Sequence, residues 1–240
     1  MTEDSTPGSV AHRASRAVGW SLLNTIASRL GTLLIGVALA RVLDPSEFGV
    51  FAIATVTMLA VLSFNELGVS LAIVRWPDDP ARIAPTVNTI SVGSSALLTI
   101  LLVVSAPAIS AALGDVSATP VVQVMALAIL INGLVATPAA MLQREFMQKQ
   151  RAIADQTNPW LGAVVSLVLA LLGMGAMSLA IGRLAGSVVS SVMLWRWSPA
   201  PYRFGWDRDV ARRVVSFGVP LPAASIGVFS SGYGDQVIVG

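Results

Sequence analysis

Seven long apolar runs dominate this sequence of 240 residues, and they restrict the fold more than any other feature. A helix needs about 20 apolar residues to cross the hydrocarbon core of a bilayer. Most of the runs reach that length, and they are too long and too uniform for the alternating strands of a membrane barrel. The sequence therefore predicts an all-α, polytopic bundle of about seven membrane-spanning helices. The expected spans are Val18–Val42, Gly49–Val74, Ala84–Leu113, Pro120–Leu142, Pro159–Gly173, Gly175–Trp197 and Val214–Gly240.

The fifth run is short and meets the sixth at the sequence GMGA, residues 173–176. This pair is therefore either a tight helical hairpin or one poorly divided stretch. The first seventeen residues are polar, and the apolar run behind them is too long for the core of a signal peptide. We expect residues 1–17 to be an uncleaved tail.

Composition excludes several classes of protein. Only 12% of the residues are charged, against about 25% in an ordinary soluble domain. The sequence has no cysteine, which rules out disulfides, thiolate metal ligands and thiol nucleophiles within this chain. We expect no cofactor and no metal site.

The basic residues predict the orientation in the membrane. With the N-terminus in the cytoplasm, twelve of the 15 Lys and Arg residues fall on the inner side and only Arg41 falls outside. This asymmetry follows the positive-inside rule. It predicts a multi-pass protein of the inner (plasma) membrane. The basic residues would lie near anionic lipids, which accounts for the positive charge, so no nucleic-acid partner is expected. The inner set is Arg13, Arg16, Arg75, Arg82, Arg144, Lys149, Arg151, Arg196, Arg203, Arg208, Arg212 and Arg213.

The segment after the sixth run mixes Trp and Tyr with arginines. Trp206, Val210 and Val214 would share one face of a helix whose other face carries Arg208 and Arg212. We expect an in-plane amphipathic helix over residues 198–213, leading into the seventh span. The alternative is a solvated basic loop.

Arg29, Glu66 and Arg183 are charged residues that lie well inside apolar runs, away from the ends. A charge at the bilayer centre costs about 2.5–3.5 kcal/mol on insertion scales, so such a group usually faces the bundle interior and has a partner. The turn near Pro45 places Arg29 level with Leu62, and Glu66 lies four residues deeper, about 6 Å away along the axis. Because helical side chains lean toward their own N-termini, we expect Arg29 and Glu66 to lean toward each other.

Four sequence motifs resemble those of a known family in their order and spacing. They are ARVLDPSEFGVFAIA from Ala40, NELGVSLAIVR from Asn65, AMLQREFMQKQRAIAD from Ala140 and FGVPLPAASIGVFSSGYGDQVIVG from Phe217. The chain from about residue 18 to residue 240 resembles the polysaccharide (O-antigen-type) flippases of the multidrug/oligosaccharidyl-lipid/polysaccharide exporter superfamily. The most specific part is Ala40 to Gly49.

The resemblance implies two helical lobes around a central cavity and transport of lipid-linked sugars by alternating access, with no enzymatic step. It implies a first lobe over 18–197, a linker over 198–213 and the start of a second lobe over 214–240, so we expect a partial chain. A second lobe or a second copy of the chain would then be a partner. The implied substrate is a polyprenyl-diphosphate-linked glycan, for which an intramembrane guanidinium is suited by its persistent charge and planar fork.

The expected site residues fall into three groups. Candidates for the substrate cavity are Arg29, Glu66, Asn65, Asn24, Arg183 and Asp235. Pro220 and Pro222, in a span with five glycines, are candidates for a hinge. For Arg41, Pro45, Glu47 and Gly49 we expect mainly a structural role in the outer turn, with Pro45 starting the turn and Gly49 permitting it.

Other readings of the sequence remain. Gly182, Gly186 and Ser190 are spaced by four and favour close helix packing over a substrate track. A cation-coupled multidrug exporter of the same superfamily is the main functional alternative, and it would need acidic residues in its spans, where Glu66 and Asp235 stand out. A membrane-embedded glycosyltransferase or polymerase is less favoured, because the outer loops are short and the inner aspartates, including Asp155, read as solvated loop charges.

Overall fold

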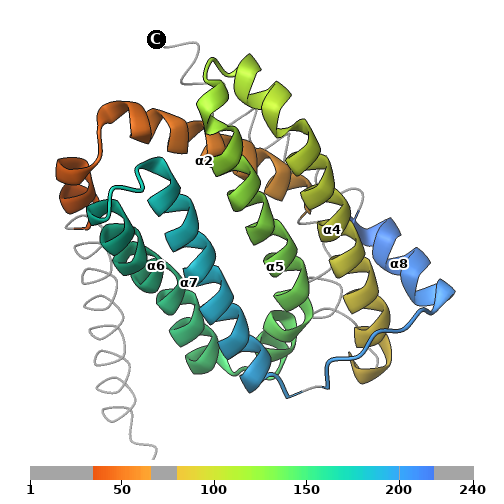
Figure 1. The fold of residues 1–240 in the computed structure, drawn as a ribbon. Helices are drawn as coiled ribbons and strands as arrows, with labels where there is room; N and C mark the ends of the chain where they lie inside the picture. The colour runs from red at the N-terminus through yellow and green to blue at the C-terminus, as the bar shows by residue number, and fades with distance from the viewer. Residues whose placement is uncertain (1–34, 66–79, 200, 219–240) are drawn as a thin grey trace, which may run out of the picture.

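The computed structural model describes residues 35–65, 80–199 and 201–218, and within these ranges every regular element is a helix (Figure 1). The described elements are α2 (Pro45–Asn65), α4 (Pro80–Ala112), the 3₁₀ turn η1 (Val116–Ala118), α5 (Thr119–Arg144), α6 (Gln148–Leu171), α7 (Ala176–Trp197) and α8 (Arg208–Gly218). Residues 35–42, before α2, are also helical. The expected all-α bundle is confirmed for this part of the chain. The seventh expected span, from residue 219 on, lies outside the described residues.

Within the described residues, four stretches are long and apolar enough to cross a membrane. They lie on α2, α4, η1 with α5, and α7: Pro45–Leu62, Arg82–Ala112, Val116–Arg144 and Ala176–Trp197. The mean hydropathy of their most apolar windows runs from 1.5 to 2.1. Much of each surface faces outward in the isolated chain, as expected for helices that contact lipid.

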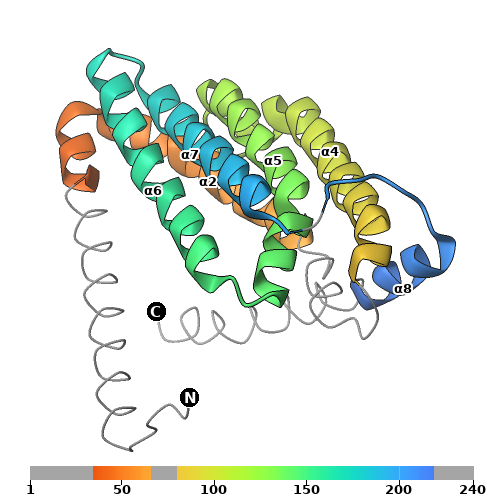
Figure 2. The ribbon, with the colours of Figure 1, turned by 90° about the horizontal axis from the view of Figure 1, so that it is seen from below.

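Helices α4, α5, α6 and α7 run alternately up and down (Figure 1). The turns at residues 113–118 and 172–175 therefore lie at one end of the bundle, which we call the short-turn end. The loop at residues 145–147 and the segment after α7 lie at the other, which we call the strap end. Figure 2, seen from below, shows α7 between α6 and α5, with α4 beyond α5.

The connection between α6 and α7 shows which of the two interpretations of GMGA, a helical hairpin or one undivided stretch, is correct. Gly173 has φ 82° and Gly175 has φ 56°, both in the left-handed region that glycine adopts at little cost. The chain reverses within residues 172–175, so the hairpin interpretation is correct.

Helix α6 begins at Gln148, eleven residues before the start expected at Pro159. Its first half is polar and carries Arg151 and Asp155, so hydropathy alone does not detect it. Pro159 lies within the helix and does not begin it. A helix of 24 residues is about 36 Å long, enough to cross a bilayer with its polar turns in the headgroup region.

Small residues let the helices approach closely. A Cβ atom at Gly133 on α5 would lie 2.2 Å from the Ser95 hydroxyl oxygen on α4. A Cβ atom at Gly182 on α7 would lie 2.4 Å from the carbonyl oxygen of Gly162 on α6. The main apolar core, from Val50 and Met58 of α2 to Ile129 of α5, fills the space between α2, α4, α5 and α7.

The segment after α7 runs along the first turns of α4 before α8 begins (Figure 1). We call residues 201–207 the strap. The Asn88 side-chain amide donates to the Arg203 carbonyl oxygen at 2.9 Å, and the Asp207 N–H donates to the Thr86 hydroxyl oxygen at 3.0 Å. The strap is therefore fixed at both ends to one face of α4.

The middle of the strap is held at Gly205. Its N–H donates to the Pro85 carbonyl oxygen at 3.2 Å, and its carbonyl oxygen accepts from the Thr89 hydroxyl at 2.8 Å. A Cβ atom at Gly205 would lie 2.9 Å from Pro85 Cβ, so a larger residue would not fit without a shift.

Helix α8 begins at Arg208, ten residues later than expected, because Asp207 caps it. The Asp207 carboxylate accepts from the N–H groups of Asp209 at 2.9 Å and Val210 at 3.3 Å, the usual role of an N-cap aspartate. Trp206 thus precedes the helix. Val210 and Val214 pack against Ile83 and Val87 of α4 and the end of α5, so this apolar face contacts the protein.

Candidate functional site

A cavity of about 450 Å³ opens among the helical residues before α2 and helices α2, α5, α6 and α7. Its wall is mainly apolar, with Leu39, Met58, Trp160 and Leu179 among the lining residues. Five polar side chains interrupt that wall: Asn132 on α5, Asn158 and Ser166 on α6, and Arg183 and Ser187 on α7. An apolar pocket with a few convergent polar groups is the usual form of a small-molecule site.

Arg183 is the one charged residue among the described residues that line the cavity. No carboxylate of the described chain lies within ion-pair distance of its guanidinium. The side chain is exposed, with the cavity beside it. An intramembrane cation without a protein partner is a functional-site candidate, because desolvating a lone charge is costly.

Asn132 and Asn158 were not among the residues expected from the sequence. An amide side chain in an apolar run indicates a functional site less strongly than a charged side chain does, although it too needs hydrogen-bond partners in an apolar environment. Asn158 packs closely against Gly186: a Cβ atom at residue 186 would lie 2.2 Å from the Asn158 carbonyl oxygen and 2.8 Å from its Oδ1. Only glycine at residue 186 leaves room for this arrangement.

The expected packing role of the small residues on α7 is confirmed for the two glycines. Gly182 and Gly186 are buried against Gly162, Ser166 and Asn158 of α6. Arg183 and Ser187 follow these glycines directly and line the cavity. Close packing of α7 on α6 thus sets the position of the polar groups.

The motif from Ala40 to Gly49 builds a helix boundary. Asp44 precedes Pro45, the first residue of α2, and the Asp44 N–H donates to Glu47 Oε2 at 3.0 Å, as in one half of a capping box. The Glu47 carboxylate also lies against Gly175 in the α6–α7 turn, where a Cβ atom would lie 2.1 Å from Oε1. Pro45 and Glu47 therefore have the expected structural role, and Arg41 is exposed at the end of the preceding helical segment.

The expectation for Gly49 is wrong. Gly49 lies within α2, not in the turn, and a Cβ atom there would meet nothing within 4 Å. The helix begins earlier than the glycine suggested, because proline at a first helical position starts a helix rather than ending one.

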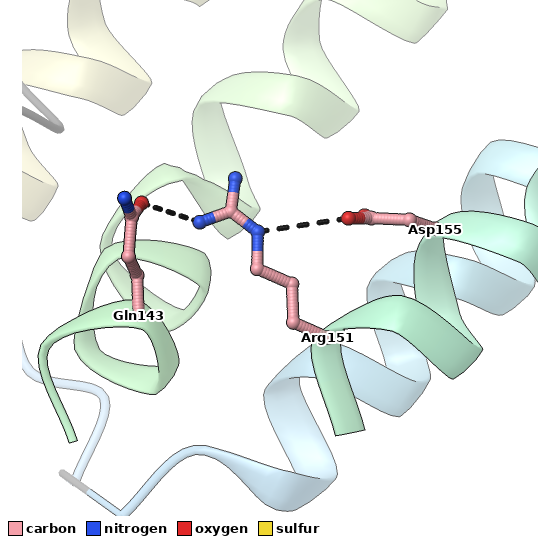
Figure 3. A network of polar contacts seen from close by, with 3 residues as sticks. All are labelled: Gln143, Arg151 and Asp155. Carbon is pink, nitrogen blue, oxygen red and sulfur yellow. Dashed lines mark hydrogen bonds and ion pairs between the residues drawn. The ribbon is translucent and has the colours of Figure 1, made fainter. Parts of the chain in front are cut away.

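The strap end carries a polar contact between α5 and α6 (Figure 3). Arg151 Nη1 donates to Gln143 Oε1, and Arg151 Nε lies 3.6 Å from Asp155 Oδ2. Asp155 is therefore a helical residue in an exposed ion pair, contrary to the expectation of a loop charge. This contact orients the start of α6 on the end of α5 and does not reach the cavity.

The remaining candidates lie at the end of a described helix or outside the described residues. Asn65 is the last residue of α2. Asn24, Arg29, Glu66, Asp235, Pro220 and Pro222 lie outside the described residues. The pairing of Arg29 with Glu66 and the hinge at the two prolines stay predictions.

Comparisons with known proteins give relatives in sequence and in fold. The chain is 28% identical over 224 residues to the succinoglycan biosynthesis transport protein ExoT of Rhizobium meliloti (strain 1021), an alignment that covers 89% of this chain and 44% of that protein. In fold it is similar to a crystal structure of MATE in complex with Br-NRF, with a TM-score of 0.61 and 20% identity over 85% of this chain and 51% of that one. An outward-facing multidrug resistance MATE family transporter of the MOP superfamily gives the same TM-score at 21% identity, again over 85% and 51%.

The chain spans about half the length of these relatives. The solved structures show the fold, which is that of half a MATE transporter. The sequence profile of a family described as "Polysaccharide biosynthesis protein" matches residues 38–240. The chain is a multi-pass membrane protein that belongs to this polysaccharide biosynthesis protein family.

Proposed function

We propose that this chain supplies one lobe of an exporter that moves a lipid-linked oligosaccharide or polysaccharide precursor across the membrane by alternating access. The cavity is the observation that carries the proposal. It is lined by the Arg183 guanidinium and by the amides of Asn132 and Asn158, and no described acidic residue pairs with Arg183. The family and the similarity to a succinoglycan transport protein indicate the kind of cargo. A second lobe, or a second copy of the chain, would complete the transport path.

The chemistry of the cavity suits a polyprenyl-diphosphate-linked glycan. Arg183 offers a persistent charge and a bidentate fork for a diphosphate oxygen pair. Asn132 and Asn158 offer donors and acceptors that match sugar hydroxyl groups. The predicted pair of Arg29 and Glu66 would add to this site, since Leu62, the residue expected level with Arg29, lines the same cavity.

We propose the inner (plasma) membrane as the location, with the N-terminus and the strap end in the cytoplasm. The distribution of basic residues supports this orientation. The short-turn end would then face outward, where the released glycan is needed.

A cation-coupled multidrug exporter is the closest alternative. Exchange of a drug for a cation needs a carboxylate that binds both in turn, and none of the described lining residues is acidic. Glu66 and Asp235 are the residues that would have to serve, so a Glu66→Gln, Asp235→Asn variant that loses drug export would favour this function.

The test is a complementation assay in cells that lack their own flippase and receive the full-length protein. Surface glycan is measured and divided by the amount of protein in the membrane. Arg183→Gln should reduce export by at least about tenfold, since a charge-assisted contact contributes about 1.5–3 kcal/mol. Arg183→Lys keeps the charge but loses the fork and should also export poorly.

Lys149→Gln is the matched control, because it removes one exposed positive charge at the strap end. It should leave export unchanged. Near-normal surface glycan from Arg183→Gln would exclude the proposed contact with the substrate.

A further inference from the structure

Exposed aromatic rings and arginines gather at the strap end, away from the cavity. Trp195 is 57% exposed, Phe204 60% and Trp206 64%. Arg196 and Arg203 are exposed and lie next to them in sequence. We call these five residues the strap patch.

The rings of the strap patch are held in a defined arrangement. The Tyr202 ring meets Trp195 edge to face, with centroids 6.2 Å apart, and meets Phe204 in the same way at 5.4 Å. The backbone beneath them is fixed to α4 by the hydrogen bonds of Arg203, Gly205 and Asp207 described above. The exposed surface is therefore preorganised, which lowers the entropic cost of binding.

The patch continues an exposed apolar stripe on α7. Val188, Val192 and Trp195 lie on one face of α7 at spacings of four and three, and all three are exposed although α7 is apolar enough to span the membrane. The aromatic contacts extend this stripe from Trp195 to Phe204. Trp195 lies near the end of α7, so in a membrane it would fall at the surface, the usual place of interfacial tryptophan.

The length of α4 gives the depth of the strap independently. Its 33 residues extend about 50 Å, against about 30 Å of hydrocarbon. The first turns, from Pro80 to Thr89, carry the strap and fall at one end of this helix. They therefore reach the headgroup region.

The charges of the patch are available to a ligand. No described carboxylate lies within ion-pair distance of Arg196 or Arg203. Asp207, the acidic residue of the strap, has its carboxylate engaged in capping α8. Guanidinium groups beside amphipathic rings match a phosphate group at the depth of the lipid headgroups.

We propose that the strap patch binds the headgroup of an anionic phospholipid, with Arg196 and Arg203 on the phosphate and Trp195, Phe204 and Trp206 in the adjoining interface. The patch is separate from the cavity, so this binding does not depend on the identity of the transported substrate. It would hold the connection between α7 and α8 at the membrane surface.

Native mass spectrometry of the purified full-length chain tests the proposal, with phosphatidylglycerol and phosphatidylcholine added in equal amounts. The wild type should retain phosphatidylglycerol in preference to phosphatidylcholine, and added salt should weaken the preference. The double variant Arg196→Gln, Arg203→Gln should reduce the preference for phosphatidylglycerol by at least about tenfold. Each basic residue near an anionic surface contributes about 1 kcal/mol, which corresponds to about fivefold in affinity. Phe204→Ser, Trp206→Ser should also lower the number of retained lipids.

The control is Arg41→Gln, Lys149→Gln, which removes the same net charge from two exposed residues outside the patch. It should keep the preference, and all variants should melt at the temperature of the wild type. An equal loss of phosphatidylglycerol in the control would overturn the proposal, because general charge would then explain the binding. A dimer mass that disappears in the Arg196, Arg203 variant would also overturn it, because a second copy would then be the occupant.

Discussion

At the scale of single residues, the site depends on glycines that let α7 pack closely against α6. Gly182 and Gly186 bring α7 against α6, and the residues that follow each of them line the cavity. Arg183 was predictable from the sequence because a charge in an apolar run is conspicuous. Asn158 was not predictable, because its position depends on close packing against Gly186. A single sequence does not show which residue a glycine faces.

This dependence predicts the effect of a single methyl group. Gly186→Ala places a Cβ atom 2.2 Å from the Asn158 carbonyl oxygen, a backbone atom that cannot move alone. Overpacking of this kind costs about 1–3 kcal/mol, so the melting temperature in detergent should fall by several degrees, at about 2–4 °C per kcal/mol. Export should fall as well, because Asn158 is displaced.

Gly93→Ala is the matched control for Gly186→Ala. Gly93 also lies within a helix, but a Cβ atom there meets nothing within 4 Å. This variant should be at least as stable as the wild type, since alanine favours helix by up to about 1 kcal/mol. If both variants melt alike, the close packing of α7 on α6 is not as described.

At the scale of elements, length and polarity decided what sequence analysis could predict. The spans on α4, α5 and α7 were predicted to within a few residues because they are continuously apolar. The polar first half of α6 and the late start of α8 were not. The strap explains the second case: its hydrogen bonds to Thr86, Asn88 and Thr89 hold residues 201–207 out of a helix, and these partners lie more than 100 residues earlier in the chain.

The strap contacts predict that the α7–α8 connection moves with the first lobe. The chain has no cysteine, so Pro85→Cys, Gly205→Cys would create a single pair. Their Cβ atoms would start 2.9 Å apart, closer than the about 3.5–4.5 Å of a disulfide, so the bond forms once the strap shifts outward by about 1 Å. Mild oxidation should cross-link this pair in high yield, and the cross-linked full-length protein should export glycan at the rate of the reduced form.

A control pair, Pro85→Cys with Gly114→Cys, joins opposite ends of α4 and should not cross-link. Export that stops on cross-linking of the first pair and returns with a reductant would show that the strap leaves α4 during transport.

At the scale of the whole molecule, the apolar runs were sufficient to predict a helical membrane bundle, while the cavity required the structure. Its wall combines residues from Ile35 to Ser187, and their convergence depends on how α2 crosses α5 and α7. Turn geometry could propose a contact between two neighbouring spans, but it could not show which helices surround an open space.

The orientation predicts the result of reporter fusions. Fusions after Arg82, Arg151 and Arg208 should report the cytoplasm, and one after Asp115 should report the outside, because the basic residues cluster at the strap end. Asp115 is a partly exposed residue in the turn at residues 113–118, where hydrogen bonds from Ser117 lower its pKa, so it carries a negative charge at that end. An outside signal after Arg151 would reverse the assignment of the two ends.

The central claim is that the cavity beside Arg183 carries a lipid-linked glycan across the membrane. Its most direct test is translocation of a fluorescent polyprenyl-diphosphate-linked oligosaccharide in proteoliposomes that contain the full-length protein. We predict that the wild type and Lys149→Gln move this lipid across the bilayer at similar rates, while Arg183→Gln is slower by at least about tenfold. Equal rates for Arg183→Gln and the wild type, or no protein-dependent translocation at all, would contradict the claim.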